Sequence, residues 1–195
     1  YPLIKGREAM VEACLDQATG QAFTDMPSNF SGSLKDLCSF SLADNAERAI
    51  FVAALNAVCR YLGWIERTLH CKNEEPEECA SHLPDYVRSI LSEPRIAFIG
   101  LQPAMVDRLS GHFPLRVADM DKENVGKEKY GLVIESEEKT AEILNWANIV
   151  LATGSTVVNN TFRFLLCDKP LVFYGVTSSA ISYLTGCRQF CVCGK

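Results

Sequence analysis

The sequence predicts an α/β protein, in which a small α+β domain precedes a C-terminal Rossmann-like parallel sheet with helices on both faces. Short apolar segments alternate with amphipathic ones after residue 94, and this alternation is typical of a parallel sheet that is covered on both sides. Three of the apolar segments end in glycine-containing turns. A Ser-Glu-Pro break at residues 92–94 separates this half from the helical segment before it. We therefore expect one domain over residues 1–93 and a Rossmann-like domain over residues 94–195.

The composition is that of an ordinary globular protein, with 48% hydrophobic and 22% charged residues among 195. The 19 basic and 24 acidic side chains are mixed along the chain and give a net charge of −5, which argues against a nucleic-acid surface. No apolar run reaches the roughly 20 residues that a membrane span needs, and the first 30 residues lack the order of a signal peptide. We expect a cytoplasmic protein without nucleic-acid or membrane partners, and a homodimer is the ordinary state for such a chain.

In the N-terminal part, a hairpin is expected over residues 7–26, because a polar break at residues 16–20 separates two apolar-rich segments. A helix over residues 5–16 is the alternative, since the apolar residues there also fit helical spacing.

Two helices are expected before the domain boundary. The first begins at the N-cap Asp44, where Glu47 completes a capping-box pattern, and it ends near Leu62 before Gly63. The second covers residues 76–91 and begins with a proline and two acids, which suit the positive end of a helix dipole.

The second half alternates strands with helices, as a doubly covered parallel sheet requires. Strands are expected at residues 96–100, 115–119, 149–153, 170–174 and 190–193, and helices at residues 103–113, 138–147, 156–166 and 178–184. Residues 121–131 form a charged, glycine-containing segment of the kind that often lies over a site, although solvent exposure alone would also explain it.

Three successive strands are followed by turns that contain Gly100, Gly154 and Gly175. In an open parallel sheet such turns lie along one edge, and that edge is where these folds bind ligands. The three glycines therefore predict a ligand cleft at the carboxyl ends of the strands.

The middle turn is the best candidate for an anion site. Gly154, which follows Thr153, lets a ligand approach the backbone, Ser155 and Thr156 offer hydroxyl groups, and the free N–H groups of the next helix point to the same place. Helix capping by Ser155 is the alternative reading, and it needs no ligand.

Asp119 lies 19 residues beyond Gly100, where a dinucleotide-binding fold places the acid that holds a ribose. The first turn lacks the second and third glycines of the dinucleotide pattern. We therefore expect a smaller or differently held ligand rather than an ordinary dinucleotide.

Two groups of thiols are candidate metal ligands among nine cysteines, an odd number that argues against a complete disulfide framework. His70, Cys71 and Cys79 offer nitrogen and sulfur donors, although neighbouring His70 and Cys71 could share an ion only from a loop. Cys191 and Cys193 would face the same side of an extended strand. Buried or redox-active thiols are the alternative reading for both groups.

Residues 20–24, 47–57 and 148–161 resemble the heavy-metal chelation family of Rossmann-like proteins, and the resemblance covers most of the chain. It implies an N-terminal domain similar to that of enolase, shortened here, and a site between the two domains. By matching position, the residues that would face this cleft are Thr24, Asn56, Thr153, Gly154, Ser155, Thr156 and Asn159.

Two functions follow from these patterns. The first is a protein that binds a transition or heavy metal ion, with a ligand cleft between the domains. The second is an enzyme that binds a nucleotide, an adenosyl compound or another anionic small molecule at the turn of residues 153–156. No nucleophile with an adjacent general base is apparent, so the question of catalysis stays open, and a non-catalytic partner protein is the third hypothesis.

Overall fold

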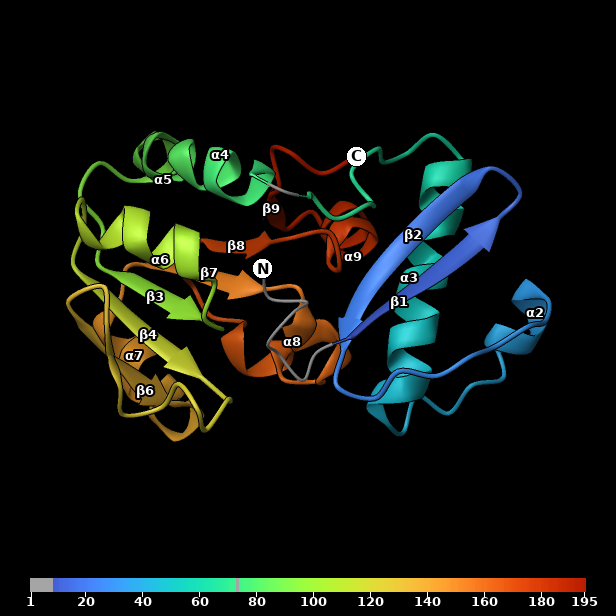
Figure 1. Ribbon diagram of the computed structural model, residues 1–195, viewed down its shortest axis with the longest axis horizontal. Helices are drawn as coiled ribbons and strands as arrows, with labels where there is room; N and C mark the ends of the chain where they lie inside the picture. The colour runs from blue at the N-terminus through green and yellow to red at the C-terminus, as the bar shows by residue number, and fades with distance from the viewer. Residues whose placement is uncertain (1–8, 73) are drawn as a thin grey trace.

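The computed structural model describes residues 9–72 and 74–195 (Figure 1). Its centre is a seven-stranded sheet in the order β5-β6-β4-β3-β7-β8-β9, parallel except for the antiparallel pair β5-β6. The strands are β3 (Ile96–Ile99), β4 (Leu115–Asp119), β5 (Glu128–Lys129), β6 (Leu132–Ser136), β7 (Ile149–Thr153), β8 (Leu171–Tyr174) and β9 (Arg188–Phe190). The α/β fold class expected from the sequence is confirmed.

The core has two halves, one on each face of the sheet, because successive side chains of a strand point to opposite faces. Ile96 and Phe98 of β3 belong to one hydrophobic cluster, whereas Ala97 belongs to the other. The first cluster is covered by α4 (Glu75–Ser81), α5 (Leu83–Ile90) and α6 (Pro103–Ser110), and the second by α3 (Asn45–Tyr61), α7 (Thr140–Trp146) and α8 (Ser155–Val158). Figure 1 shows α6 and α7 on opposite sides of the sheet, and α3 beside the hairpin.

The N-terminal part is a hairpin that packs on one long helix. Strands β1 (Ala9–Leu15) and β2 (Ala18–Thr24) pair antiparallel, so the hairpin is confirmed for the described residues and the alternative helix is wrong there. A Cβ atom at Gly20 would lie 2.3 Å from the Ala53 carbonyl oxygen of α3, so only glycine allows this close packing. A short helix α2 (Leu34–Leu37) lies between the hairpin and α3.

Helix α3 begins as the sequence predicts, because the Asp44 side chain accepts a hydrogen bond of 2.9 Å from the Glu47 backbone N–H. Its apolar face shares the second core cluster with the sheet. Helices α4 and α5 lie before the expected domain boundary, yet they pack on the sheet and on α6. The boundary between residues 93 and 94 stays a prediction.

The single helix expected over residues 76–91 is wrong, because the chain forms two helices that meet at His82. Pro84 has no backbone N–H and cannot continue the hydrogen bonding of α4, so a new helix begins there. The helix expected over residues 156–166 is also shorter, since α8 ends at Val158 and Asn160 adopts a positive φ of 56°. A 3₁₀ turn, η2 (Phe162–Leu165), follows it.

Two strand predictions need correction. Strand β6 was not expected, and the charged segment of residues 121–131 includes β5, which pairs with it. The last strand, expected at residues 190–193, is instead Arg188–Phe190. Its partner β8 ends at Tyr174, opposite Phe190, so the chain beyond has no strand to pair with. Helix α9 (Ser179–Thr185) matches its prediction within one residue.

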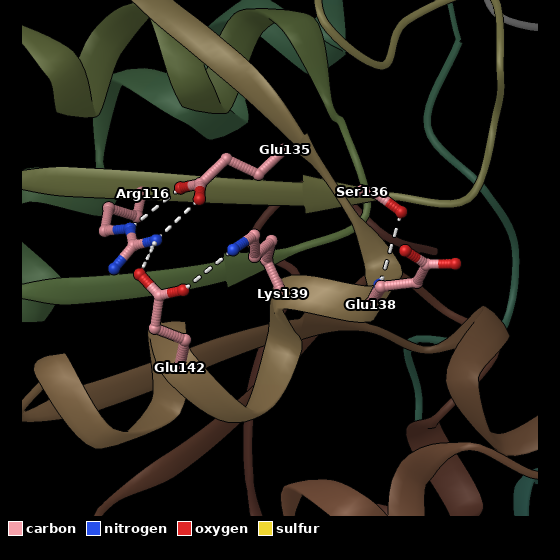
Figure 2. A network of polar contacts seen from close by, with 6 residues as sticks. All are labelled: Arg116, Glu135, Ser136, Glu138, Lys139 and Glu142. Carbon is pink, nitrogen blue, oxygen red and sulfur yellow. Dashed lines mark hydrogen bonds and ion pairs between the residues drawn. The ribbon is translucent and has the colours of Figure 1, made fainter.

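An ion-pair network fastens the edge of the sheet to α7. Arg116 of β4 binds both carboxylate oxygens of Glu135 on β6, at 2.8 and 2.5 Å, and reaches Glu142 of α7 at 2.9 Å (Figure 2). Lys139 joins the same Glu142 at 3.2 Å (Figure 2). The guanidinium also lies over the Trp146 ring, 5.8 Å from its centroid. The network is structural, since each of its charged groups is paired with another member.

Within residues 9–72 and 74–195, each helix is too short or too polar to cross a lipid bilayer.

Candidate functional site

The three predicted glycine turns lie at one rim of the sheet, because β3, β7 and β8 are neighbours and run in the same direction. The turn at Gly100 is closely packed. A Cβ there would lie 2.6 Å from the Thr153 methyl group, and the Tyr174 hydroxyl donates a 2.5 Å hydrogen bond to the Gly100 carbonyl. Gly100 and Gly175 have φ values of 88° and 83°, a region that favours glycine. The sharp turns therefore account for both glycines without a ligand.

The turn from Thr153 to Thr156 is filled by the protein itself. A Cβ at Gly154 would lie 2.7 Å from the Ser178 backbone nitrogen, so its small size lets two turns pack together. The Thr156 hydroxyl donates to the Thr153 carbonyl at 2.7 Å, and the hydroxyls of Thr153 and Ser155 lie 3.3 Å apart. The capping alternative is wrong in detail, because Gly154 rather than Ser155 is the N-cap of α8. Anion binding at this turn stays a prediction.

Asp119 is held by donors from its own chain. Its carboxylate accepts hydrogen bonds from the Leu101 N–H at 2.9 Å, the Asp121 N–H at 2.7 Å and the Asn124 side-chain amide at 3.3 Å. These bonds fasten the first strand-to-helix turn to the loop after β4. A ribose would have to compete with them, so this acid has a structural role whether or not it also binds a ligand.

Asn56 of α3 joins the N-terminal part to the sheet. Its side chain is fully buried, and its amide group donates to the carbonyls of Gln21 at 3.0 Å, Val176 at 3.1 Å and Thr177 at 3.3 Å. Its oxygen accepts from the Ala180 N–H at 2.8 Å. Both the amide nitrogen and the oxygen of this side chain thus have partners inside the protein.

Thr24 and Asn159 lie at the seam between the hairpin and α8. Thr24 is buried, and its hydroxyl donates to the Asn45 carbonyl at 3.5 Å. The Asn45 amide in turn donates to the side chains of Asp25 at 2.7 Å and Asn159 at 3.2 Å. Of the residues that family resemblance assigned to the cleft, Asn56 and Asn159 therefore form hydrogen bonds between the two parts. A ligand-binding role for this set stays a prediction.

A second assembly forms where the C-terminal tail returns to the chain before α4 (Figure 1). Lys195 exchanges backbone hydrogen bonds with Leu69, at 3.0 and 2.6 Å, and also accepts one from the Thr68 N–H at 3.0 Å. The Lys195 ammonium forms an ion pair of 2.7 Å with Glu75, the first residue of α4. This ion pair lowers the pKa of the Glu75 carboxyl.

These contacts bring the two predicted thiol groups together. Cys79 belongs to the first hydrophobic core cluster and Cys193 packs against it, and the nearby Cys79 thiol raises the pKa of Cys193, after the larger effect of burial. Cys71 and Cys191 also interact electrostatically with Cys79. We call Cys71, Cys79, Cys191 and Cys193 the four-thiol cluster. Among the described residues, no group of three histidine, cysteine or acidic side chains has the arrangement of a metal site. The thiols are therefore neighbours and do not form a preformed coordination shell.

Burial dominates the electrostatics of the four-thiol cluster. Burial and, after it, the nearby Cys79 raise the pKa of Cys71 to about 11 and that of Cys191 to about 12. The pKa of Cys193 is also raised, first by burial and then by Cys79. Cys71 and Cys191 are therefore protonated at neutral pH.

The sequence prediction that Cys191 and Cys193 share the face of a strand is wrong, because both follow the end of β9. The His70 ring packs at nearly a right angle to that of Phe23, with centroids 5.1 Å apart, and burial lowers its pKa. Its role as a metal ligand stays a prediction. Sequence reasoning missed the Lys195–Glu75 ion pair, since no local pattern connects the last residue with the start of α4.

Residues 83–188 match the family DUF364, described as "Putative heavy-metal chelation". The chain belongs to this family. The residues matched to DUF364 contain the three glycine turns, whereas the four-thiol cluster lies outside them. No curated protein matches the chain.

Two solved structures from DUF364, both described as proteins with unknown function, share the fold. One, from Pyrococcus horikoshii, is 21% identical with a TM-score of 0.63, and the match covers 93% of this chain and 74% of that one. The other, from Desulfitobacterium hafniense, is 15% identical with a TM-score of 0.60, and the match covers 90% of this chain and 71% of that one. At these identities the likeness concerns the fold alone.

Proposed function

We propose that the protein binds one thiophilic transition or heavy metal ion through the four-thiol cluster. The observation that carries the proposal is the meeting of two thiol pairs that lie more than 100 residues apart in the sequence. Thiolates are the donors that soft and borderline metal ions prefer, and four of them suit a tetrahedral ion. The family description is consistent with this function but does not identify the ligands.

The chain around the cluster allows the thiols to close on an ion. Cys79 is held in α4, whereas Cys191 and Cys193 lie in turn-like chain beyond the last strand. We expect this tail to move its sulfur atoms toward Cys79 when an ion binds, because it lies outside the strands of the sheet. Cys79 and Cys191 are buried, and Cys71 and Cys193 are half-buried, so the bound ion would be largely shielded from water.

Cationic side chains beside the cluster would offset the charge of four thiolates around one ion. The guanidinium of Arg67 lowers the pKa of Cys191, opposing the larger effect of burial. The Lys195 ammonium interacts electrostatically with Cys193 and Cys71, in addition to its ion pair with Glu75. A tetrathiolate complex of a divalent ion has two excess negative charges, and these two cations lie where they would compensate them.

The test is an anaerobic titration of the reduced protein with Cd²⁺, followed by thiolate-to-metal charge-transfer absorption and by elemental analysis after desalting. We expect one ion per chain. The double variant Cys79→Ser/Cys193→Ser should lose this binding, because two of four donors are removed.

The matched control replaces three exposed thiols elsewhere, Cys14, Cys38 and Cys167, by serine. This control should bind Cd²⁺ like the unmodified protein. The proposal fails if the control variant loses the ion, or if the cluster variant binds as well as the unmodified protein.

A further inference from the structure

We infer that Cys79 and Cys193 form a reversible disulfide by exchange with a small-molecule disulfide such as oxidised glutathione, and that this bond switches off metal binding at the four-thiol cluster. The pairing of the two cysteines stands on the geometry of the tail and α4. Its consequence for metal binding rests on the function proposed above.

The tail and α4 match each other at two points. Glu75 and Cys79 are four residues apart and lie on one face of α4, separated by about 6 Å along the helix axis. Lys195 and Cys193 are two residues apart, and because Cys193 lies in a turn their spacing is at most the roughly 6.6 Å of extended chain. Lys195 meets Glu75 at 2.7 Å, and Cys193 packs against the hydrophobic cluster to which Cys79 belongs. The ion pair and the backbone bonds of Lys195 therefore hold the tail against α4, with Cys193 close to Cys79.

The difference in exposure gives the two thiols separate roles. Cys193 is half-buried, so a small disulfide can reach it from solvent, whereas Cys79 is 3% exposed. Cys79 is therefore the resolving thiol, which attacks only after Cys193 has reacted. Cys191 is less suited to the first step, because it is 5% exposed and a Cβ at Gly194 would lie only 2.7 Å from its sulfur.

The exchange balances in two steps. The Cys193 thiolate attacks one sulfur of oxidised glutathione, the disulfide bond of that molecule breaks, and one glutathione leaves as a thiolate that takes up the proton from Cys193. The Cys79 thiolate then attacks the Cys193 sulfur and displaces the second glutathione, which takes up the proton from Cys79. Two protein thiols are oxidised, and one glutathione disulfide is reduced to two thiols.

Tryptic cleavage allows the pairing to be mapped, because it separates the candidate thiols. Cys71 falls in the peptide of residues 68–72, Cys79 in that of residues 73–88, and the other two in that of residues 189–195. The metal-free protein is incubated with oxidised glutathione at mildly alkaline pH, acid-quenched, alkylated, digested and analysed by mass spectrometry without reduction. We expect a cross-link between residues 73–88 and 189–195. It should persist in Cys191→Ser and disappear in Cys193→Ser, with both variants folded by circular dichroism.

The pairing is overturned if residues 189–195 link to residues 68–72, if Cys191 and Cys193 link to each other, or if only glutathione adducts form. For the metal, the oxidised protein should lose Cd²⁺ binding and regain it after dithiothreitol, and unchanged binding would overturn the switch. If the reduced protein binds Cd²⁺ but forms no cross-link, the proposed function stands and this inference falls. If the cross-link forms but the reduced protein binds no Cd²⁺, the pairing stands while the proposed function and the switch fall.

Discussion

Replacing Asn56 tests whether this residue stabilises the seam between the two parts of the protein or only faces a ligand there. The residue is fully buried, and its side chain bonds to backbone groups of β2 and of the turn that leads into α9. Asn56→Leu keeps a similar volume but removes every one of these bonds. A residue that only faced a ligand would tolerate this change without loss of stability.

The expected loss can be worked out from the partners that remain. The Val176 carbonyl keeps hydrogen bonds from the Ser179 backbone at 3.1 Å and from its hydroxyl at 2.8 Å. The Ala180 N–H and the Thr177 carbonyl lose their bonds to Asn56. At about 1–3 kcal/mol for each buried group left unsatisfied, Asn56→Leu should lower the free energy of unfolding by about 4 kcal/mol. For a chain of this size, that corresponds to roughly 12 °C in Tm.

The assay is urea unfolding of both proteins, followed by circular dichroism. The matched control is Asn145→Leu, at an exposed position of α7, which should change the free energy of unfolding by less than about 0.5 kcal/mol. Asn56→Asp should be at least as destabilising as Asn56→Leu, because it turns an oxygen toward three carbonyl oxygens. If Asn56→Leu lies within about 1 kcal/mol of the unmodified protein, the hydrogen bonds of Asn56 do not hold the seam and our reasoning is wrong.

Three further predictions test other parts of the structure. Gly154→Ala should cost about 1–3 kcal/mol in thermal unfolding, because its Cβ would clash with the Ser178 backbone nitrogen, and an unchanged Tm would contradict the packing described. Arg116→Gln should destabilise the protein at neutral pH but less in acid. Arg116 lowers the pKa of Glu142, and this stabilisation is lost as the pH falls through that lowered value. The prediction is refuted if the difference in free energy of unfolding between the variant and the unmodified protein stays constant in urea titrations from pH 7 to pH 3. Metal binding should tighten from pH 7 to pH 9, because the pKa of Cys71 is raised to about 11 and its thiol must lose a proton to bind the ion. The affinity should rise by up to about tenfold per pH unit for each thiol proton released. A pH-independent affinity would exclude the buried thiols as ligands.

Much of the fold could be predicted because its local signals are strong. The central strands are short apolar runs that end at glycine turns, and α3 begins at an N-cap that the sequence displays. Strand β6 gave no such signal, since only Ile134 of its five residues is fully buried at this outer position of the sheet. The end of β9 could not be predicted either, because it depends on where β8 stops.

By itself, the sequence determined which chemical groups are present and where the backbone turns. Glycines follow the strands, and two pairs of thiols lie at separate places along the chain. These features depend on residue type and on neighbours a few positions away, which local physical chemistry governs.

Only the tertiary structure decided which groups meet. It supplied backbone partners for Asp119 and Asn56, two residues that spacing or family resemblance had assigned to a ligand. It also returned the tail to α4, where Cys193 meets Cys79 across 114 positions of sequence. Contacts at such separations depend on how helices and strands pack into one core, and no local pattern carries that information.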